Sequence, residues 1–85
     1  MQGVILMKNC VVIGIEPKQF TFKTGEVVQG RYIHYGYKKS DTQGYCVDKI
    51  FLSDNKFNDL VIKLNNEFNI YYNKYGKVEM VEITK

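Results

Sequence analysis

The sequence predicts a small all-β protein, with five strands in an OB-like barrel and one short helix between the third and fourth strands. Two observations predict this fold class. Runs of β-branched and aromatic residues recur along the 85-residue chain, and turn-forming residues separate them. The elements follow the order strand, hairpin, strand, short helix, hairpin, and a five-stranded SH3-like barrel competes closely with the OB-like one. Barrel closure would spare so small a chain from exposed sheet edges.

The first strand is expected over Val4–Ile15, where most residues are β-branched or otherwise apolar. The polar pair Lys8 and Asn9 interrupts this run, which predicts a bend in the strand. Pro17, the only proline, is expected to end the strand because its nitrogen cannot donate a ladder hydrogen bond.

A β-hairpin is predicted next. Phe20–Lys23 alternates aromatic and polar residues, and Thr24 with Gly25 supplies a tight turn into a second strand, Glu26–Tyr37. Strand alternation then places Val27, Gln29, Arg31, Ile33, Tyr35 and Tyr37 on one face, and Val28, Gly30, Tyr32, His34 and Gly36 on the other. Neither face is cleanly apolar, and glycine inside a strand marks a bulge, a bend or the close approach of a ligand.

The middle of the chain predicts a loop, a strand and the short helix. Lys38–Gly44 is polar and rich in turn-forming residues, so we expect a mobile loop, and Tyr45–Ser53 resumes strand character. Ser53 is a suitable N-cap for a helix. The apolar face of that helix would be formed by Phe57, Leu60, Val61 and Leu64, which recur at helical spacing.

Two further strands, Glu67–Asn73 and Lys77–Thr84, are expected to form the second hairpin. Gly76 fits the left-handed position of the short loop between them, and Lys74 and Tyr75 would lie at its tip. No repeat and no linker divides the sequence, so residues 1–85 are predicted to form a single domain.

Composition indicates an ordinary globular protein, with 45% hydrophobic and 25% charged residues. No window approaches the roughly 18 apolar residues of a membrane span. The early run GVILM is shorter than the usual apolar core of a signal peptide, about 7 residues, and is broken at once by Lys8. We therefore expect a cytoplasmic protein that does not bind a membrane.

An enzymatic function is not expected. The chain has none of the common nucleophile, phosphate-loop or metalloprotease motifs, and its one histidine, His34, has no partner suggested by spacing. Cys10 and Cys46 lie far apart among apolar residues and are predicted to be reduced thiols in or near the core. We expect no cofactor, no metal ion and no small-molecule substrate.

Positive charge gathers where the aromatic residues are. Residues 17–40 hold five basic residues against one acidic residue, a balance of +4, whereas residues 41–72 hold three against five, a balance of −2. Six of the seven tyrosines lie in or beside the predicted hairpins or the basic loop: Tyr32, Tyr35, Tyr37, Tyr71, Tyr72 and Tyr75. Aromatic rings beside cationic side chains are typical of proteins that bind single-stranded nucleic acid.

The sequence therefore predicts a sequence-tolerant binding surface for single-stranded nucleic acid, either DNA or RNA. Its candidate residues are Lys23, Arg31, Tyr35, Tyr37, Lys38, Lys39, Lys74, Tyr75 and Lys77. Tyr32 and His34 receive less weight because they lie on the face opposite Arg31 and Tyr35. The alternative is a small barrel that uses its tyrosine-rich surface to bind protein, since tyrosine and arginine also dominate protein interfaces.

Residues 15–32, IEPKQFTFKTGEVVQGRY, resemble the N-terminal part of the helix-destabilising single-stranded DNA-binding proteins of filamentous phages. The positions that carry the resemblance are Ile15, Pro17, Gln19, Phe20, Thr21, Lys23, Gly25, Gln29, Gly30 and Arg31. The chain departs from the family pattern at Val28, where the family has a basic residue, and at Ile33, where it has an aromatic residue. Residues 38–44 and the motif YYNKYGKV do not match that pattern either.

The resemblance implies an OB-type barrel and a two-fold homodimer that coats single-stranded DNA cooperatively. It also implies stacking aromatic residues on the strand after Gln-Gly and on a hairpin loop. A distant relative of this family would serve the DNA replication of a phage or of another mobile element of a bacterium.

Overall fold

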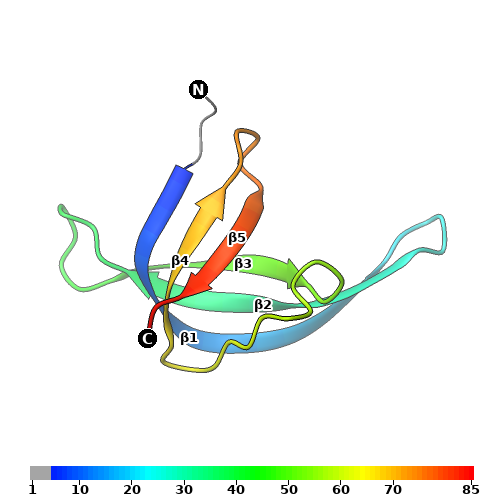
Figure 1. Ribbon diagram of the computed structural model, residues 1–85, viewed down its shortest axis with the longest axis horizontal. Helices are drawn as coiled ribbons and strands as arrows, with labels where there is room; N and C mark the ends of the chain where they lie inside the picture. The colour runs from blue at the N-terminus through cyan, green and yellow to red at the C-terminus, as the bar shows by residue number, and fades with distance from the viewer. Residues whose placement is uncertain (1–4) are drawn as a thin grey trace.

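A computed structural model describes residues 5–85 as five antiparallel strands in one sheet, in the order β3-β2-β1-β4-β5 (Figure 1). The strands are β1 (Ile5–Thr21), β2 (Val27–Tyr37), β3 (Cys46–Ser53), β4 (Glu67–Tyr72) and β5 (Val78–Ile83). The predicted all-β class is confirmed. Val4, the expected first residue of the first strand, lies outside the described residues.

The long strand β1 organises the sheet because it pairs with two neighbours in turn. Its first part pairs with β4, from Ile5 to Val11, and the part from Val11 onward pairs with β2. The strand bends between these parts: the register with β4 shifts between Met7 and Cys10, and Asn9 has a φ of 59°. This confirms the bend predicted at Lys8 and Asn9.

The prediction that Pro17 ends the first strand is wrong, because β1 continues to Thr21. Pro17 lies opposite Arg31 of β2, but β4 pairs with β1 only as far as Val11. This part of β1 is therefore an edge strand, where proline is tolerated.

The prediction of a short helix after Ser53 is also wrong, because the structure has turns and irregular backbone over residues 54–66. The four residues of the expected apolar helix face have different environments. Phe57 and Leu60 pack against the core, whereas Val61 and Leu64 are 70% and 57% exposed. Asparagine and aspartate are frequent in this segment and favour turns over helix by bonding to nearby backbone groups.

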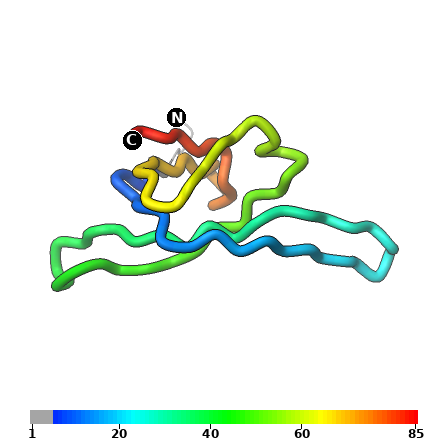
Figure 2. The backbone as a smooth tube through the Cα atoms, turned by 90° about the horizontal axis from the view of Figure 1, so that it is seen from below, coloured from blue at the N-terminus to red at the C-terminus, as the bar shows by residue number. Residues whose placement is uncertain are grey.

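The strongly bent sheet folds over itself into two layers, as Figure 2 shows. One layer contains β2, β3 and the second part of β1, and the other contains β4 and β5. Within residues 5–85 no ladder joins β3 to β5, so the sheet is open and a closed barrel is not confirmed. The irregular segment 54–66 connects the two layers (Figure 2).

The core lies between the two layers. Its buried residues are Cys10, Val12, Ile33, Tyr35, Ile50, Leu52, Ile62, Phe68, Ile70 and Val81. The Tyr35 ring packs edge-on against Phe68, with 5.7 Å between ring centroids. Every strand contributes to this core, so the layers depend on each other for burial of their inner faces.

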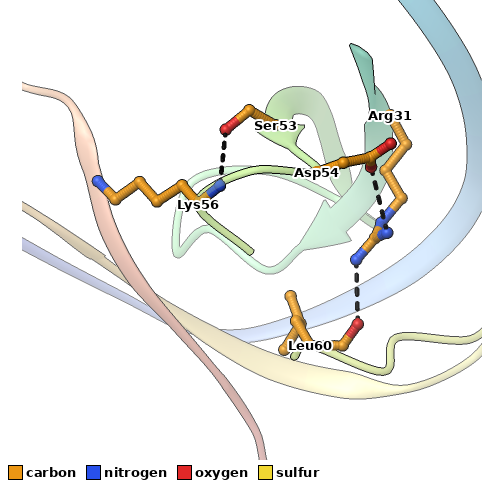
Figure 3. Close-up of polar contacts among 5 residues, drawn as sticks. All are labelled: Arg31, Ser53, Asp54, Lys56 and Leu60. Atoms are coloured by element: carbon orange, nitrogen blue, oxygen red, sulfur yellow. Dashed lines mark hydrogen bonds and ion pairs between the residues drawn. The ribbon is translucent and has the colours of Figure 1, made fainter. Parts of the chain in front are cut away.

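Arg31 of β2 holds the irregular segment against the sheet (Figure 3). Its Nη2 donates a hydrogen bond to the carbonyl oxygen of Leu60 at 3.1 Å, and its Nη1 lies 3.9 Å from Asp54 Oδ1. The backbone nitrogen of Asp54 donates to the carbonyl of Gln29 at 2.9 Å. Arg31 Nε is buried without a hydrogen-bond partner among the described atoms, and the side chain as a whole is 24% exposed.

The two cysteines should differ sharply in reactivity. Cys10 is fully buried, and burial raises the pKa of its thiol to about 11, whereas Cys46 is half-buried. At pH 8 only about one Cys10 thiol in a thousand is then a thiolate. We expect iodoacetamide at pH 8 to add one label to the native protein, at Cys46, and two labels in urea, as measured by mass spectrometry. The Cys46→Ser variant should stay unlabelled when native, and labelling of its Cys10 would contradict this packing.

Candidate functional site

The two faces of β2 have different environments. On the inner face Ile33 and Tyr35 are buried in the core, and Tyr35 is only 1% exposed. On the outer face Tyr32 and His34 are half-buried and border solvent. Since successive side chains of a strand point to opposite sides, the burial of Ile33 decides which tyrosine of β2 is accessible.

Three aromatic side chains meet on the outer face, and we call Phe20, Tyr32 and Phe51 the aromatic cluster. The Phe20 ring centroid lies 5.2 Å from that of Phe51 and 6.3 Å from that of Tyr32, and 5.5 Å separates Tyr32 from Phe51. All three pairs are edge-to-face, an arrangement that aromatic pairs prefer. The cluster joins β1, β2 and β3, because Tyr32 lies between Glu16 of β1 and Phe51 of β3.

Gly30 makes room for the cluster. A Cβ atom at this position would lie 2.6 Å from Cζ of Phe51 and would also collide with the carbonyl oxygen of Leu52. The absence of a side chain on Gly30 lets the Phe51 ring lie over the β2 backbone. The glycine that the sequence marked as a bulge, bend or ligand site thus serves close packing of an aromatic ring.

Cationic groups flank the aromatic cluster. Lys49 Nζ lies 4.3 Å from the centroid of the Tyr32 ring, within the range of a cation–π interaction. Lys18 is exposed and, by its register opposite Gly30, shares the outer face. His34 Nε2 lies 3.1 Å from Glu16 Oε1, so one carboxylate also stands beside the cluster. The outer face therefore combines aromatic rings with two lysines, one histidine and one carboxylate.

Three of the predicted binding residues are directed to the interior. Tyr35 is a core residue, Tyr37 packs against the core, and Arg31 holds residues 54 and 60. Burial raises the pKa of the Tyr35 and Tyr37 hydroxyls above the usual value, so both remain neutral at physiological pH. In this structure these three side chains are not available to a ligand on the outer face.

The other predicted residues lie at three separate ends of the molecule (Figure 1). Lys23 is at the tip of the β1–β2 hairpin, whereas Lys38 and Lys39 are in the β2–β3 loop. The third end is the tip of the β4–β5 hairpin with Lys74, Tyr75 and Lys77, where the Tyr75 ring is 75% exposed and Lys74 Nζ lies 5.2 Å from its centroid. The structure does not bring these three groups together within one chain.

Phe20, Phe51, Lys49 and Lys18 were not predicted to share one surface, and Tyr32 and His34, which received less weight, lie on that surface. The alternation of side chains along β2 could have indicated which face is buried. Ile33, the most apolar residue of the strand centre, shares its face with Arg31 and Tyr35, so burial of Ile33 places these two side chains on the inner face. The positions of Phe20 and Phe51 depend on strand register, which the sequence of either strand alone does not specify.

Comparison with known proteins gives no relatives: no family model, no curated protein and no solved structure matches the chain. Residues 5–85 also contain no group of three or more side chains placed to hold a metal ion. No helix in this part of the chain is long and apolar enough to cross a membrane. The fold and the site thus define an open five-stranded β-sheet protein with an aromatic and cationic outer face.

Gly30→Ala should destabilise the protein and disturb the aromatic cluster. The added methyl group needs space that Phe51 and the β3 backbone occupy, so we expect a loss of about 1–3 kcal/mol in the free energy of unfolding. Urea unfolding followed by circular dichroism measures this loss. Gly36→Ala is the matched control, because the nearest atom to its added Cβ is at 3.6 Å, an ordinary contact. Equal stability of the two variants would contradict the packing described at Gly30.

Proposed function

We propose that the protein binds single-stranded nucleic acid on the outer face of β1, β2 and β3, by base stacking on the aromatic cluster and phosphate contacts from lysines. The observation that carries the proposal is the position of Lys49 Nζ, 4.3 Å from the Tyr32 ring centroid, beside two further rings on one accessible face. On binding, the Lys49 ammonium would move from the Tyr32 ring to a phosphate, and a base would take its place against the ring.

The energetics of stacking suit a ligand without fixed sequence. A base stacked on an aromatic side chain contributes about 1–3 kcal/mol, whatever the base is, because every base has a π-face. Paired bases in a duplex have their faces covered by neighbouring pairs, so a single strand is the ligand that gains from this surface. Lysine contacts to phosphate add affinity that falls as the salt concentration rises.

The strand order supports the proposal at the level of the fold. From the order β3-β2-β1-β4-β5 we infer an OB-like barrel that is open between β3 and β5. OB-folds are partly open five-stranded barrels that bind oligonucleotides on the face of strands 2 and 3. In this chain that face carries Tyr32, Phe51 and Lys49.

The remaining lysines extend the charged surface along the molecule. Figure 1 shows the β1–β2 hairpin and the β2–β3 loop at opposite ends, and the longest dimension of the chain is 44 Å. Lys23 lies at one end, and Lys38 and Lys39 lie at the other. A strand that crosses the aromatic cluster along this axis would meet positive charge at both ends, which favours association.

The resemblance of residues 15–32 to phage single-stranded DNA-binding proteins favours DNA over RNA, a cytoplasmic location and a role in the replication of a phage or mobile element. It also favours a homodimer. In such a dimer the exposed Tyr75 and its neighbour Lys74 would contact a strand bound to the partner subunit.

A protein-binding function is the second candidate, because Tyr75 and Met80 are 75% and 48% exposed in the β4–β5 hairpin. Exposed tyrosine and methionine are enriched in protein interfaces. Sedimentation of the wild type and of Tyr75→Ala separates the two functions. If this substitution abolishes an oligomer and no oligonucleotide binds the wild type, the hairpin is a protein interface and the proposed nucleic-acid function is wrong.

Tyr32→Ala should weaken binding to single-stranded DNA about tenfold, because it removes the ring at the centre of the aromatic cluster. Fluorescence anisotropy with a labelled oligothymidylate at low salt measures the change. Tyr71→Ala is the matched control: this half-buried tyrosine of β4 lies outside the aromatic cluster and donates a hydrogen bond to Glu82 Oε1 at 2.9 Å. Absence of salt-sensitive binding by the wild type would overturn the proposed function.

Glu16→Gln should strengthen the same binding about twofold. A carboxylate about 8 Å from a phosphate repels it by about 0.5 kcal/mol in water, and the amide removes this repulsion while it can still contact His34. Anisotropy at low salt detects the gain, which should vanish at high salt. Glu82→Gln, a charge change of the same size on β5, should leave the affinity unchanged. Equal gains from both variants would mean that only net charge matters and that the strand does not follow the outer face.

A further inference from the structure

A second apolar area lies on the outer face, apart from the aromatic cluster. It is a hollow of about 190 Å³ lined by Val11, Ile13, Gly36, Tyr45 and Val47. Three of these side chains are well exposed: Ile13 is 55%, Tyr45 is 58% and Val47 is 68% exposed. Large apolar side chains grouped on an accessible surface mark an interaction site more often than isolated ones do.

The local backbone creates the hollow. The β1–β2 register shifts between Val12 and Gly14, so Ile13 is an extra residue in β1. Bulges of this kind redirect side chains and are frequent near functional sites. Gly36 supplies the floor, since a Cβ there would be 3.6 Å from Cβ of Tyr45. The chain thus forms a shallow apolar depression with Tyr45 as its one aromatic wall.

Two lysines, Lys38 and Lys49, and one carboxylate, Asp48, lie beside the hollow. Lys38 Nζ lies 5.3 Å from the centroid of the Tyr45 ring. A neighbouring depression, lined by Ile13, His34, Val47, Asp48 and Lys49, connects the hollow with the lysine that covers Tyr32. This face therefore has two aromatic rings that each have a lysine above them: Tyr45 with Lys38 and Tyr32 with Lys49. Lys49 lies between the hollow and the aromatic cluster.

The spacing of the two places suits one strand of nucleic acid. Val47 and Phe51 are four residues apart on β3, or about 13 Å at about 3.3 Å per residue. This length corresponds to at most about four base steps of one strand at about 3.4 Å each. The binding face would then hold a short run of nucleotides with an aromatic ring at each end.

We propose that the hollow is a second base-binding site, which takes a nucleobase of the strand whose other bases stack on the aromatic cluster. The base would lie against Tyr45 and the apolar side chains of Ile13 and Val47, and Lys38 would contact its phosphate. The inference rests on the proposed function and deepens it, because it sets a path along β3 and a minimum ligand length.

The test is the dependence of affinity on oligonucleotide length. We would titrate the wild type, Tyr32→Ala and the double variant Tyr45→Ser with Val47→Ser against oligothymidylates of about 2 to about 12 nucleotides by anisotropy. The double variant should bind the shortest oligomers as the wild type does and bind the longer ones about tenfold more weakly. Tyr32→Ala should weaken binding at every length. Val61→Ser, at a residue that is 70% exposed on the irregular segment, is the control for loss of apolar surface.

A second variant makes the test independent of folding defects. The chain has no tryptophan, so Tyr45→Trp places a single indole in the hollow. Long oligomers should quench its fluorescence, and the shortest should not.

The failures are distinguishable. If the wild type binds but the double variant matches it at every length and the indole is not quenched, the second site is wrong and the proposed function stands. If the wild type binds no oligomer, both are wrong. If the double variant alters only sedimentation, the hollow contacts protein and the inference is overturned.

Discussion

The alternation of side chains along β2 is the constraint on which the rest of this structure depends. Ile33 and Tyr35 must face the core, because they connect the layer of β1–β3 with Phe68 of β4. Burial of two large apolar side chains stabilises the fold by several kcal/mol, more than any surface contact of Tyr35 would contribute. Once these residues face inward, Tyr32 and His34 must face outward. The buried residues of β2 therefore determine which of its side chains are accessible to a ligand.

No ladder joins β3 to β5 within residues 5–85, and the irregular segment 54–66 contributes to the core. Ile62 belongs to the buried cluster, and Phe57 and Leu60 pack against it. Arg31 adds polar contacts with Leu60 and Asp54. Arg31, which the sequence suggested as a phosphate ligand, thus anchors segment 54–66, which belongs to no strand or helix.

The sequence allowed prediction of the β class, the bend at Asn9, both hairpins and the turn at Gly76, because each depends on local residue preferences. It did not allow prediction of the continuation of β1 past Pro17, which depends on where β4 stops pairing. The helix prediction was wrong because asparagine and aspartate in segment 54–66 favour turns, and Val61 and Leu64 are exposed and do not extend a buried helical face. The aromatic cluster brings together residues 20, 32 and 51 through register, a property of the assembled sheet and not of any one segment.

Pro17 has a consequence beyond the geometry of β1. The part of β1 that follows Val11 has β2 on one side and no strand on the other within the described chain. Such an edge can recruit a strand from another molecule and start aggregation. A residue without an N–H, followed by the charged Lys18, makes this edge a poor template for a new ladder. The long β1–β2 hairpin can therefore be exposed to solvent without pairing along this edge with a strand of another molecule.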